Sequence, residues 1–289
     1  MERNSFVKSH ALGNDYIVLD PANLMFPLTF ETVRLICDRH LGVGSDGILA
    51  RVPSSKADFG LRIYNPDGSE AEKSGNGLRI FARYLFDHGL LKSPEFTVET
   101  PGGIVKVTMH VVNGSVQRIT VEMGTATFLS ERIPVTGPAR EVVNEYLDVD
   151  GQRLTITAVS VGNPHCVVFV PQLEEVELQR MGPLLEHHPI FPSRTNVQFA
   201  EVKSRKRVAI LIWERGAGHT LASGSSACAV AAAAVRKGIA DRDLTIAMQG
   251  GDLQISVGPD WSIRMSGPAE EVYSGTFSDA FLERLTSPR

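Results

Sequence analysis

The sequence has few of the features that bind a metal, a nucleotide or a nucleic acid. Its three cysteines, Cys37, Cys166 and Cys228, are scattered without a CxxC pair, so neither a disulfide framework nor a zinc site is indicated. A Walker phosphate-binding loop is absent. The net charge of −4 argues against an electrostatic nucleic-acid binder. If the chain is an enzyme, we expect its own side chains to carry out the chemistry, without a cofactor or a metal.

Long apolar segments are also missing. The longest apolar run, Ala227 to Val235, is far too short to span a bilayer, and the polar start Met1–Asn4 has no signal-peptide core. We therefore expect a cytoplasmic protein that does not bind membranes. What the sequence does contain is typical of a globular protein: 289 residues, of which 43% are hydrophobic and 21% charged. That length allows one large domain or two medium ones.

Both halves of the chain alternate strand-like and helix-like segments, which is typical of an α/β fold. Helical spacing of apolar residues predicts helices over 29–40, 173–186 and 225–237. Alternating apolar residues predict strands over 16–19, 59–64, 96–100, 104–109 and 117–123 in the first half. In the second half the predicted strands cover 154–161, 166–170, 196–202, 208–213, 244–248, 253–257 and 262–265.

Two short motifs occur in both halves. Gly13-Asn14-Asp15-Tyr16 and Gly162-Asn163-Pro164-His165 each open a strand, whereas Ser74-Gly75-Asn76-Gly77 and Ser223-Gly224-Ser225-Ser226 each open a helix. The asparagine of the strand motif precedes the serine of the helix motif by 60 residues in each half. This equal spacing predicts a duplicated domain with pseudo-two-fold symmetry.

Two such halves are expected to meet at a cleft to which each contributes a helix start. A helix N-terminus presents unpaired N–H groups and a partial positive charge. Gly75 and Gly224 have no Cβ, so the backbone there can come close to a ligand. One glycine-rich helix start alone would be interpreted as an ordinary cap. The symmetric pair instead indicates a binding site for one carboxylate.

Two longer motifs resemble the signatures of the diaminopimelate epimerase family. The first runs from Asn65 to Arg79, with Ser74 where the family has cysteine. The second comprises Glu214-Arg215-Gly216 and the segment from Thr220 to Ser225, with Ser223 where the family has cysteine. The resemblance covers essentially the whole chain and includes Gly13-Asn14-Asp15, Gly44, Asp46-Gly47, Gly162-Asn163-Pro164-His165 and Arg194-Thr195-Asn196-Val197.

The resemblance implies a fold of two pseudo-symmetric α/β domains, each a mixed β-sheet wrapped around a central helix. We expect the first domain to cover residues 1–121 with a C-terminal return over 276–289, and the second to cover 122–275. Similar proteins need neither pyridoxal phosphate nor a metal and commonly form homodimers.

The activity that the resemblance implies is inversion of one α-carbon of LL-diaminopimelate to give the meso form, on the path to lysine and peptidoglycan. The family's two thiols act as base and acid on opposite faces of the carbon, and Ser74 and Ser223 occupy their positions here. The implied substrate-binding residues are Gly75, Asn76, Gly224 and Ser225 for the α-carboxylate, Asn65, Asn163, Asn196 and Arg215 for the distal end, Glu214 for the α-amino group, His165 beside the reacting carbon and Asn14 in the same pocket. Taken singly, several of these have simpler interpretations, since Asn65 suits a turn and His165 a buried core.

The two serines leave several hypotheses open. A thiol has a pKa of about 8.5, whereas an alcohol ionises near the value for water, about 15.7. The difference of about seven units corresponds to roughly 10 kcal/mol, of which helix starts could recover only a small part. The chain could be a paralogue that binds the amino acid and epimerises it slowly or not at all. It could run different chemistry, with His165 or another neighbour activating a serine, or be an ordinary epimerase into which the serines were engineered. A non-catalytic binding or sensor protein is a further alternative.

Overall fold

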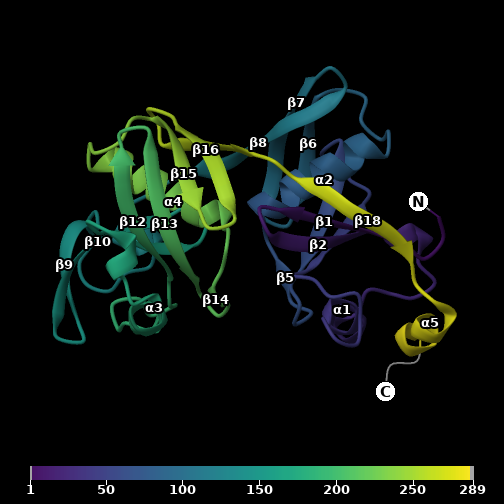
Figure 1. Cartoon of the computed structure of the whole chain (residues 1–289), viewed down its shortest axis with the longest axis horizontal. Helices are drawn as coiled ribbons and strands as arrows, with labels where there is room; N and C mark the ends of the chain where they lie inside the picture. Colours follow the sequence, from purple (N-terminus) through teal and green to yellow (C-terminus); the bar gives the residue numbers. More distant parts are fainter. Residues whose placement is uncertain (1, 287–289) are drawn as a thin grey trace. The chain divides into compact units, whose positions relative to one another are not determined.

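The computed structural model describes residues 2–286, which form two compact units. Unit 1 contains the described residues up to Val121 and those from Gly267 onward, and unit 2 contains Glu122–Ser266. In Figure 1 the first part of unit 1 is purple to blue, its returning C-terminal part is yellow, and unit 2 is mainly teal to green. Unit 2 is thus formed by one continuous segment, and unit 1 by the two segments before and after it.

Unit 1 is built on one mixed sheet. Neighbouring strands pair in the order β18 (Glu270–Thr276), β1 (Ser5–Ala11), β2 (Asn14–Leu19), β3 (Ile48–Val52), β4 (Phe59–Tyr64), β6 (Glu95–Thr100), β7 (Gly103–Val112) and β8 (Ser115–Thr125). The β2–β3 and β4–β6 pairs are parallel, and the other pairs are antiparallel. The two-residue strand β5 (Glu70–Ala71) pairs with β4.

Unit 2 repeats this order. Its strands pair in the order β9 (Val143–Val149), β10 (Gln152–Ser160), β11 (Pro164–Phe169), β12 (Asn196–Ser204), β13 (Arg207–Glu214), β15 (Asp243–Met248), β16 (Gly251–Val257) and β17 (Ser262–Gly267). The β11–β12 and β13–β15 pairs are parallel, and β14 (Gly218–His219) pairs with β13 as β5 does with β4. The two sheets therefore have the same topology, which confirms the predicted duplicated α/β fold.

One helix lies at the centre of each unit. In unit 1, α2 (Gly75–Asp87) packs against β1, β2, β7 and β18, and in unit 2, α4 (Gly224–Arg236) packs against β10 to β13, β15 and β16. Ten of the thirteen residues of each helix are buried. A helix buried on nearly all sides requires small or apolar residues around its circumference, and the alanine run of α4 supplies them. This confirms a mixed sheet around a central helix in each unit.

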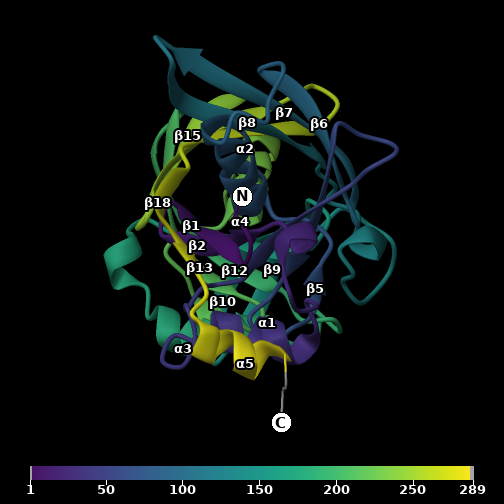
Figure 2. The same ribbon diagram turned by 90° about the vertical axis from the view of Figure 1, so that its right-hand side faces the viewer.

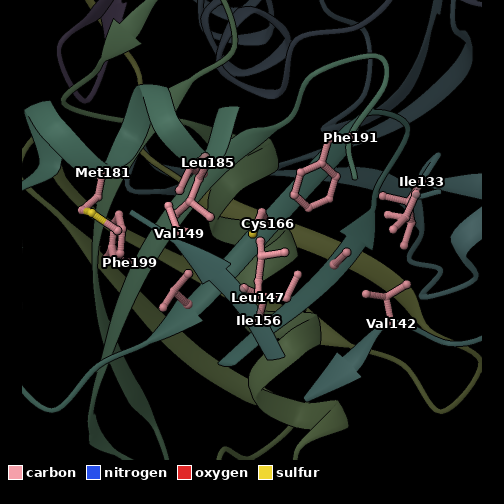
Figure 3. Packing of buried hydrophobic residues seen from close by; sticks show 14 of the residues in the cluster. Ile133, Val142, Leu147, Val149, Ile156, Cys166, Met181, Leu185, Phe191 and Phe199 are labelled. Carbon is pink, nitrogen blue, oxygen red and sulfur yellow. The ribbon is translucent and has the colours of Figure 1, made fainter. Parts of the chain in front are cut away.

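The other helices cover the sheets. In unit 1, α1 (Phe30–Cys37) and α5 (Asp279–Thr286) share one apolar cluster and lie beside each other in Figure 2. In unit 2, α3 (Leu178–Glu186) packs Met181 and Leu185 into a cluster with Phe191 and Phe199 (Figure 3). Three 3-10 turns complete the elements, η1 (Pro21–Asn23), η2 (Ser130–Arg132) and η3 (Leu173–Glu175).

Several sequence-based predictions differ from the structure. The helix predicted over 29–40 ends at Cys37, because Asp38 is extended, and the helix predicted over 173–186 is divided where Val176 is extended. The C-terminal return expected over 276–289 begins earlier, since β18 already pairs with β1. Residues 287–289 of that range lie outside the described part. Within residues 2–286, no helix is long and apolar enough to cross a bilayer.

Candidate functional site

The unit 1 half of the predicted site is centred on the start of α2. Ser74 is the N-cap, with φ −139° and ψ 118°, and its Oγ accepts a hydrogen bond from Gly77 N at 3.0 Å. This is the ordinary geometry of a serine cap. Gly75 and Asn76 form the first turn, where N–H groups have no partner within the helix. The hydroxyl of Ser74 thus lies at the positive end of the helix.

A chain of hydrogen bonds connects this helix start to the beginning of β2. Asn76 Nδ2 donates to Asn14 Oδ1 at 3.0 Å, and Arg79 Nη2 donates to Asn76 Oδ1 at 2.9 Å. Asn14 Nδ2 in turn donates to Asp46 Oδ2 at 2.9 Å. Asn76 is buried and Arg79 is fully buried, so the orientation of both side chains is fixed. The structure therefore brings four predicted site residues together, Asn14, Ser74, Gly75 and Asn76, and Asp46 and Arg79 hold them by hydrogen bonds.

A compact group of charges fixes the β2 end of this chain. Arg39 Nη2 lies 2.7 Å from Asp15 Oδ1 and 2.6 Å from Asp46 Oδ1, and the buried Lys8 amine also contacts Asp15. Burial raises the pKa of Asp15, but the hydrogen bonds from Arg39 and Lys8 outweigh it, so the net pKa lies below the usual value. Asp15 is therefore a carboxylate at neutral pH and stabilises this end of the strand.

Two further side chains of unit 1 bear on the prediction. Tyr16 Oη lies 3.5 Å from Ser74 Oγ, and the Tyr16 side chain is buried. Asn65 Nδ2 donates to Ser69 Oγ at 3.0 Å within the turn between β4 and β5. The contacts of Asn65 are therefore those of a turn residue. Among the described residues, no hydrogen bond joins its side chain to the start of α2.

The unit 2 half of the predicted site is centred on the start of α4. Ser223 is the N-cap, with φ −142° and ψ 121°, nearly the same backbone conformation as Ser74. Its Oγ accepts from Ser226 N at 3.4 Å and lies 3.4 Å from Ser225 Oγ. Ser223 and Gly224 are buried. The duplicated motif therefore gives two serine hydroxyls in equivalent positions, one in each unit.

His165 is a buried, neutral member of this half. Its Nδ1 lies 3.1 Å from Gln198 Nε2 and its Nε2 lies 2.9 Å from Asn163 Oδ1. Burial lowers the pKa of His165, the hydrogen bond with Gln198 opposes this shift, and the nearby charge of Arg215 adds to it, so that the net pKa is about 3. Both ring nitrogens have partners, and among the described residues no hydrogen bond joins the ring to Ser223. The hypothesis that His165 activates a serine as a base therefore stays a prediction.

A turn at the end of β13 carries the charged residues Glu214 and Arg215. Asn196 accepts from Arg215 N at 3.0 Å through Oδ1 and donates to Pro164 O at 2.8 Å through Nδ2. Arg215 Nη1 donates to Ser193 O at 2.9 Å, while the residue remains exposed. Asn196 and Arg215 thus lie together, next to the strand motif of Asn163 and His165.

Glu186, at the end of α3, holds the same turn and was not among the predicted site residues. Its Oε1 accepts from Gly216 N at 3.0 Å and from Arg194 Nη1 at 3.1 Å, and its Oε2 accepts from Trp213 Nε1 at 2.8 Å. Only 3% of Glu186 is exposed. Gln198 was missed for the same reason as Glu186: a polar residue in an amphipathic element is expected at the surface, and neither local pattern shows burial.

The two halves supply hydrogen-bond donors, hydroxyl groups and the exposed side chain of Arg215. Helix N–H groups with Asn76 or Ser225 beside them suit a carboxylate, and the exposed Arg215 guanidinium suits a second anionic group. Within residues 2–286, no three His, Cys, Asp or Glu side chains are grouped to hold a metal ion. Each unit can therefore offer a hydroxyl and helix N–H groups to a polar ligand.

The fold of two matching α/β units is shared with solved structures of amino-acid racemases and epimerases. A probable proline racemase from Agrobacterium radiobacter superposes with a TM-score of 0.70 at 16% identity, covering 98% of this chain and 95% of that one. A hydroxyproline epimerase from Agrobacterium vitis gives a TM-score of 0.70 at 16% identity, covering 94% and 90%. At such identities the likeness establishes the fold alone.

The family follows from the sequence itself. The diaminopimelate epimerase family model matches residues 6–129 and 157–272. Diaminopimelate epimerase 2 of a Nostoc species is 49% identical over 274 residues, covering 94% of this chain and 95% of that protein. Diaminopimelate epimerase of Desulfitobacterium hafniense is 45% identical over 274 residues, covering 93% and 96%. The chain belongs to the diaminopimelate epimerase family.

Proposed function

We propose that this protein is a cofactor-independent amino-acid epimerase that acts on diaminopimelate, or on a similar amino acid, with Ser74 and Ser223 at the two proton-transfer positions. The observation that carries the proposal is the pair of matching serine-capped helix starts, one in each unit of a chain that belongs to this family. Inversion of a carbon requires one proton-transfer group on each face, and a duplicated fold supplies two equivalent groups.

In this proposal the two units act on one substrate molecule. The N–H groups at Gly75 and Gly224 bind the α-carboxylate, and Asn76 and Ser225 lie beside them. Asn65, Asn163, Asn196 and Arg215 bind the distal amino-acid end, and Glu214 binds the α-amino group. Asn14 and His165 act as neighbours that keep Asn76 and Asn163 in place.

A second candidate is a protein that binds the same amino acid without epimerising it. The observation in its favour is the nature of the two hydroxyls, since each already accepts a backbone N–H as a helix cap and, among the described residues, no hydrogen bond joins either of them to His165. Donation of an N–H to an oxygen stabilises its anion by a few kcal/mol, well below the roughly 10 kcal/mol that separates an alcohol from a thiol. The two candidates share the binding site and differ in turnover.

Ligand binding tests the part that both candidates share. Diaminopimelate should raise the melting temperature, because a ligand that binds only the folded state stabilises it. Arg215→Ala should reduce this shift, since a charge-assisted contact of about 1.5 to 3 kcal/mol is lost. Arg205→Ala, which removes an exposed arginine paired with Asp241, is the matched control and should leave the shift intact. Absence of a shift with every stereoisomer would contradict the proposal.

We also infer a cytoplasmic homodimer. The dimer is supported by the family to which the chain belongs. The cytoplasm is supported by the cysteines, because Cys37, Cys166 and Cys228 are all free thiols. Light scattering in solution tests the dimer: the expected mass is twice the 31.5 kDa of the chain. A mass equal to that of one chain would contradict it.

A further inference from the structure

We propose that Tyr16 and Ser74 form a proton relay, in which the phenol of Tyr16 takes the hydroxyl proton of Ser74 while Ser74 takes the α-proton of the substrate. The relay rests on the proposed function, because it requires an amino acid whose α-carbon lies against Ser74. It answers the chemical difficulty that two serines create, and it concerns one unit only.

The geometry of unit 1 brings the two hydroxyls together. Tyr16 Oη lies 3.5 Å from Ser74 Oγ. This is longer than a strong O–H···O bond, but hydrogen bonds at catalytic groups often shorten only when the ligand is bound. Ser74 Oγ accepts from Gly77 N, so its own proton is free to be donated in another direction. Tyr16 Oη lies within reach as the acceptor.

Gly47 makes this approach possible. The ring of Tyr16 lies so close to Gly47 that an added Cβ would stand 2.7 Å from Tyr16 Cε1 and 2.4 Å from Tyr64 O. Any other residue at position 47 would therefore displace the ring or the strand. The rest of the Tyr16 side chain is surrounded by the interior of unit 1, because only 8% of the residue is exposed. The hydroxyl is directed at Ser74 by packing.

The second unit lacks the equivalent pair. His165 occupies the position that corresponds to Tyr16, since it follows Tyr16 by 149 residues, the same offset as Ser223 from Ser74. Its ring nitrogens are bonded to Gln198 and Asn163. Ser223 Oγ instead lies near Ser225 Oγ, another alcohol. The relay is therefore a property of the Ser74 face alone.

The chemistry balances with water as the only other participant. A fraction of the Tyr16 phenol loses its proton to solvent, which a phenol does near a pKa of about 10, against about 15.7 for an alcohol. The phenolate then takes the Ser74 Oγ proton while Ser74 Oγ takes the α-proton. The Cα–H electron pair stays on Cα next to the carboxylate, and both oxygens end as O–H groups. The strength of the base is thus set by the phenol.

Deuterium uptake at the α-carbon in D2O tests the relay. Four proteins are compared: the native chain, Tyr16→Phe, Ser74→Cys, and Ser74→Cys with Tyr16→Phe. In the native background, Tyr16→Phe should lower the exchange rate by about 100-fold or more, the usual range for general acid–base groups, without weakening diaminopimelate binding. With cysteine at position 74 the same change should have little effect, because a thiol ionises by itself. Tyr64→Phe, a nearby phenol of unit 1, should leave exchange unchanged.

The stereochemical outcome gives an independent result. Because the relay serves one face, the native protein should incorporate deuterium with retention of configuration faster than it forms the other stereoisomer. Equal losses from Tyr16→Phe in both backgrounds would indicate a structural role and overturn the relay. Exchange by the Ser74→Cys protein but none by the native chain would overturn the relay together with the proposed turnover, and would favour the candidate that binds the amino acid without epimerising it. Binding without exchange in all four proteins would overturn both.

Discussion

At the scale of single residues, Ser74 and Ser223 have the same structural role. Each Oγ caps a central helix by accepting a backbone N–H, and in the proposed function each also takes part in proton transfer. Serine is a good N-cap, and its loss from such a position costs about 1 kcal/mol. The two hydroxyls therefore stabilise their helices, whereas their weak acidity limits proton transfer.

The histidine of the unit 2 half gives a prediction about stability and pH. The folded pKa of His165 is lowered by burial to about 3, below its unfolded value near 6.5, so the folded state binds fewer protons. Its contribution to stability is fully present above pH 6.5 and is lost as the pH falls toward 3, by up to about 1.4 kcal/mol per pH unit. Denaturant unfolding at a series of pH values measures this slope.

Two variants test this prediction, His165→Asn as the test and His40→Asn as the control. His165→Asn should flatten the acid side of the stability profile, although it also lowers stability at neutral pH by removing two buried contacts. His40→Asn, at an exposed position, should leave the profile as it is. An unchanged acid slope in His165→Asn would mean that the ring is protonated in the folded protein.

At the scale of elements, α3 controls the turn that carries Glu214 and Arg215. Glu186 is the last residue of that helix and accepts from Trp213, Gly216 and Arg194. Glu186→Gln keeps the shape but replaces one acceptor oxygen with a donor. We expect a loss of about 1 to 3 kcal/mol in the free energy of unfolding, since a buried donor then faces a donor.

The same change should weaken diaminopimelate binding, because the Arg215 turn is no longer held. Glu177→Gln is the matched control at the other end of α3, where Glu177 pairs with Arg180 in an exposed position. It should change both quantities very little. If Glu186→Gln lowers the free energy of unfolding as expected but leaves binding unaltered, the turn keeps its conformation without Glu186.

The sequence predicted most elements of both units and missed several, among them β1, β3 and α5. β1 was overlooked because Lys8 and Ser9 interrupt its apolar pattern, although both are buried. Lys8 is accommodated by Asp15 and the carbonyl of Gly44, two contacts that no local pattern reveals. Conversely, the helix starts at Ser74 and Ser223 were predicted correctly, since a cap and its glycine are encoded within a few residues.

The residues of the candidate site also fall into two groups, those that a sequence motif identifies and those that only the structure reveals. Asn14 and Asn76 were identified by motif, and the structure joins them directly. Arg79 also lies in the first motif, but its contact with Asn76 is one that the motif alone does not predict. The Tyr16 hydroxyl belongs to this second group, because 58 residues separate it from Ser74 along the chain.

At the scale of the whole molecule, the central claim is that the duplicated fold is organised for proton transfer on two faces of one carbon. Each unit contributes one serine-capped helix, and neither unit alone supplies both proton-transfer groups. If the claim holds, replacing both hydroxyls with thiols should restore the missing acidity. The difference of about seven pKa units leaves ample room for a large increase in rate.

The most direct test is to incubate the Ser74→Cys, Ser223→Cys double variant with LL-diaminopimelate in D2O and follow the α-proton signal and the formation of the meso isomer. The double variant should epimerise far faster than the native protein, whereas each single variant should gain much less, because inversion needs a group on both faces. Melting temperatures, expected to fall slightly as the caps weaken, verify that all variants are folded. A folded double variant that binds diaminopimelate but neither exchanges the α-proton nor forms the meso isomer would contradict the account.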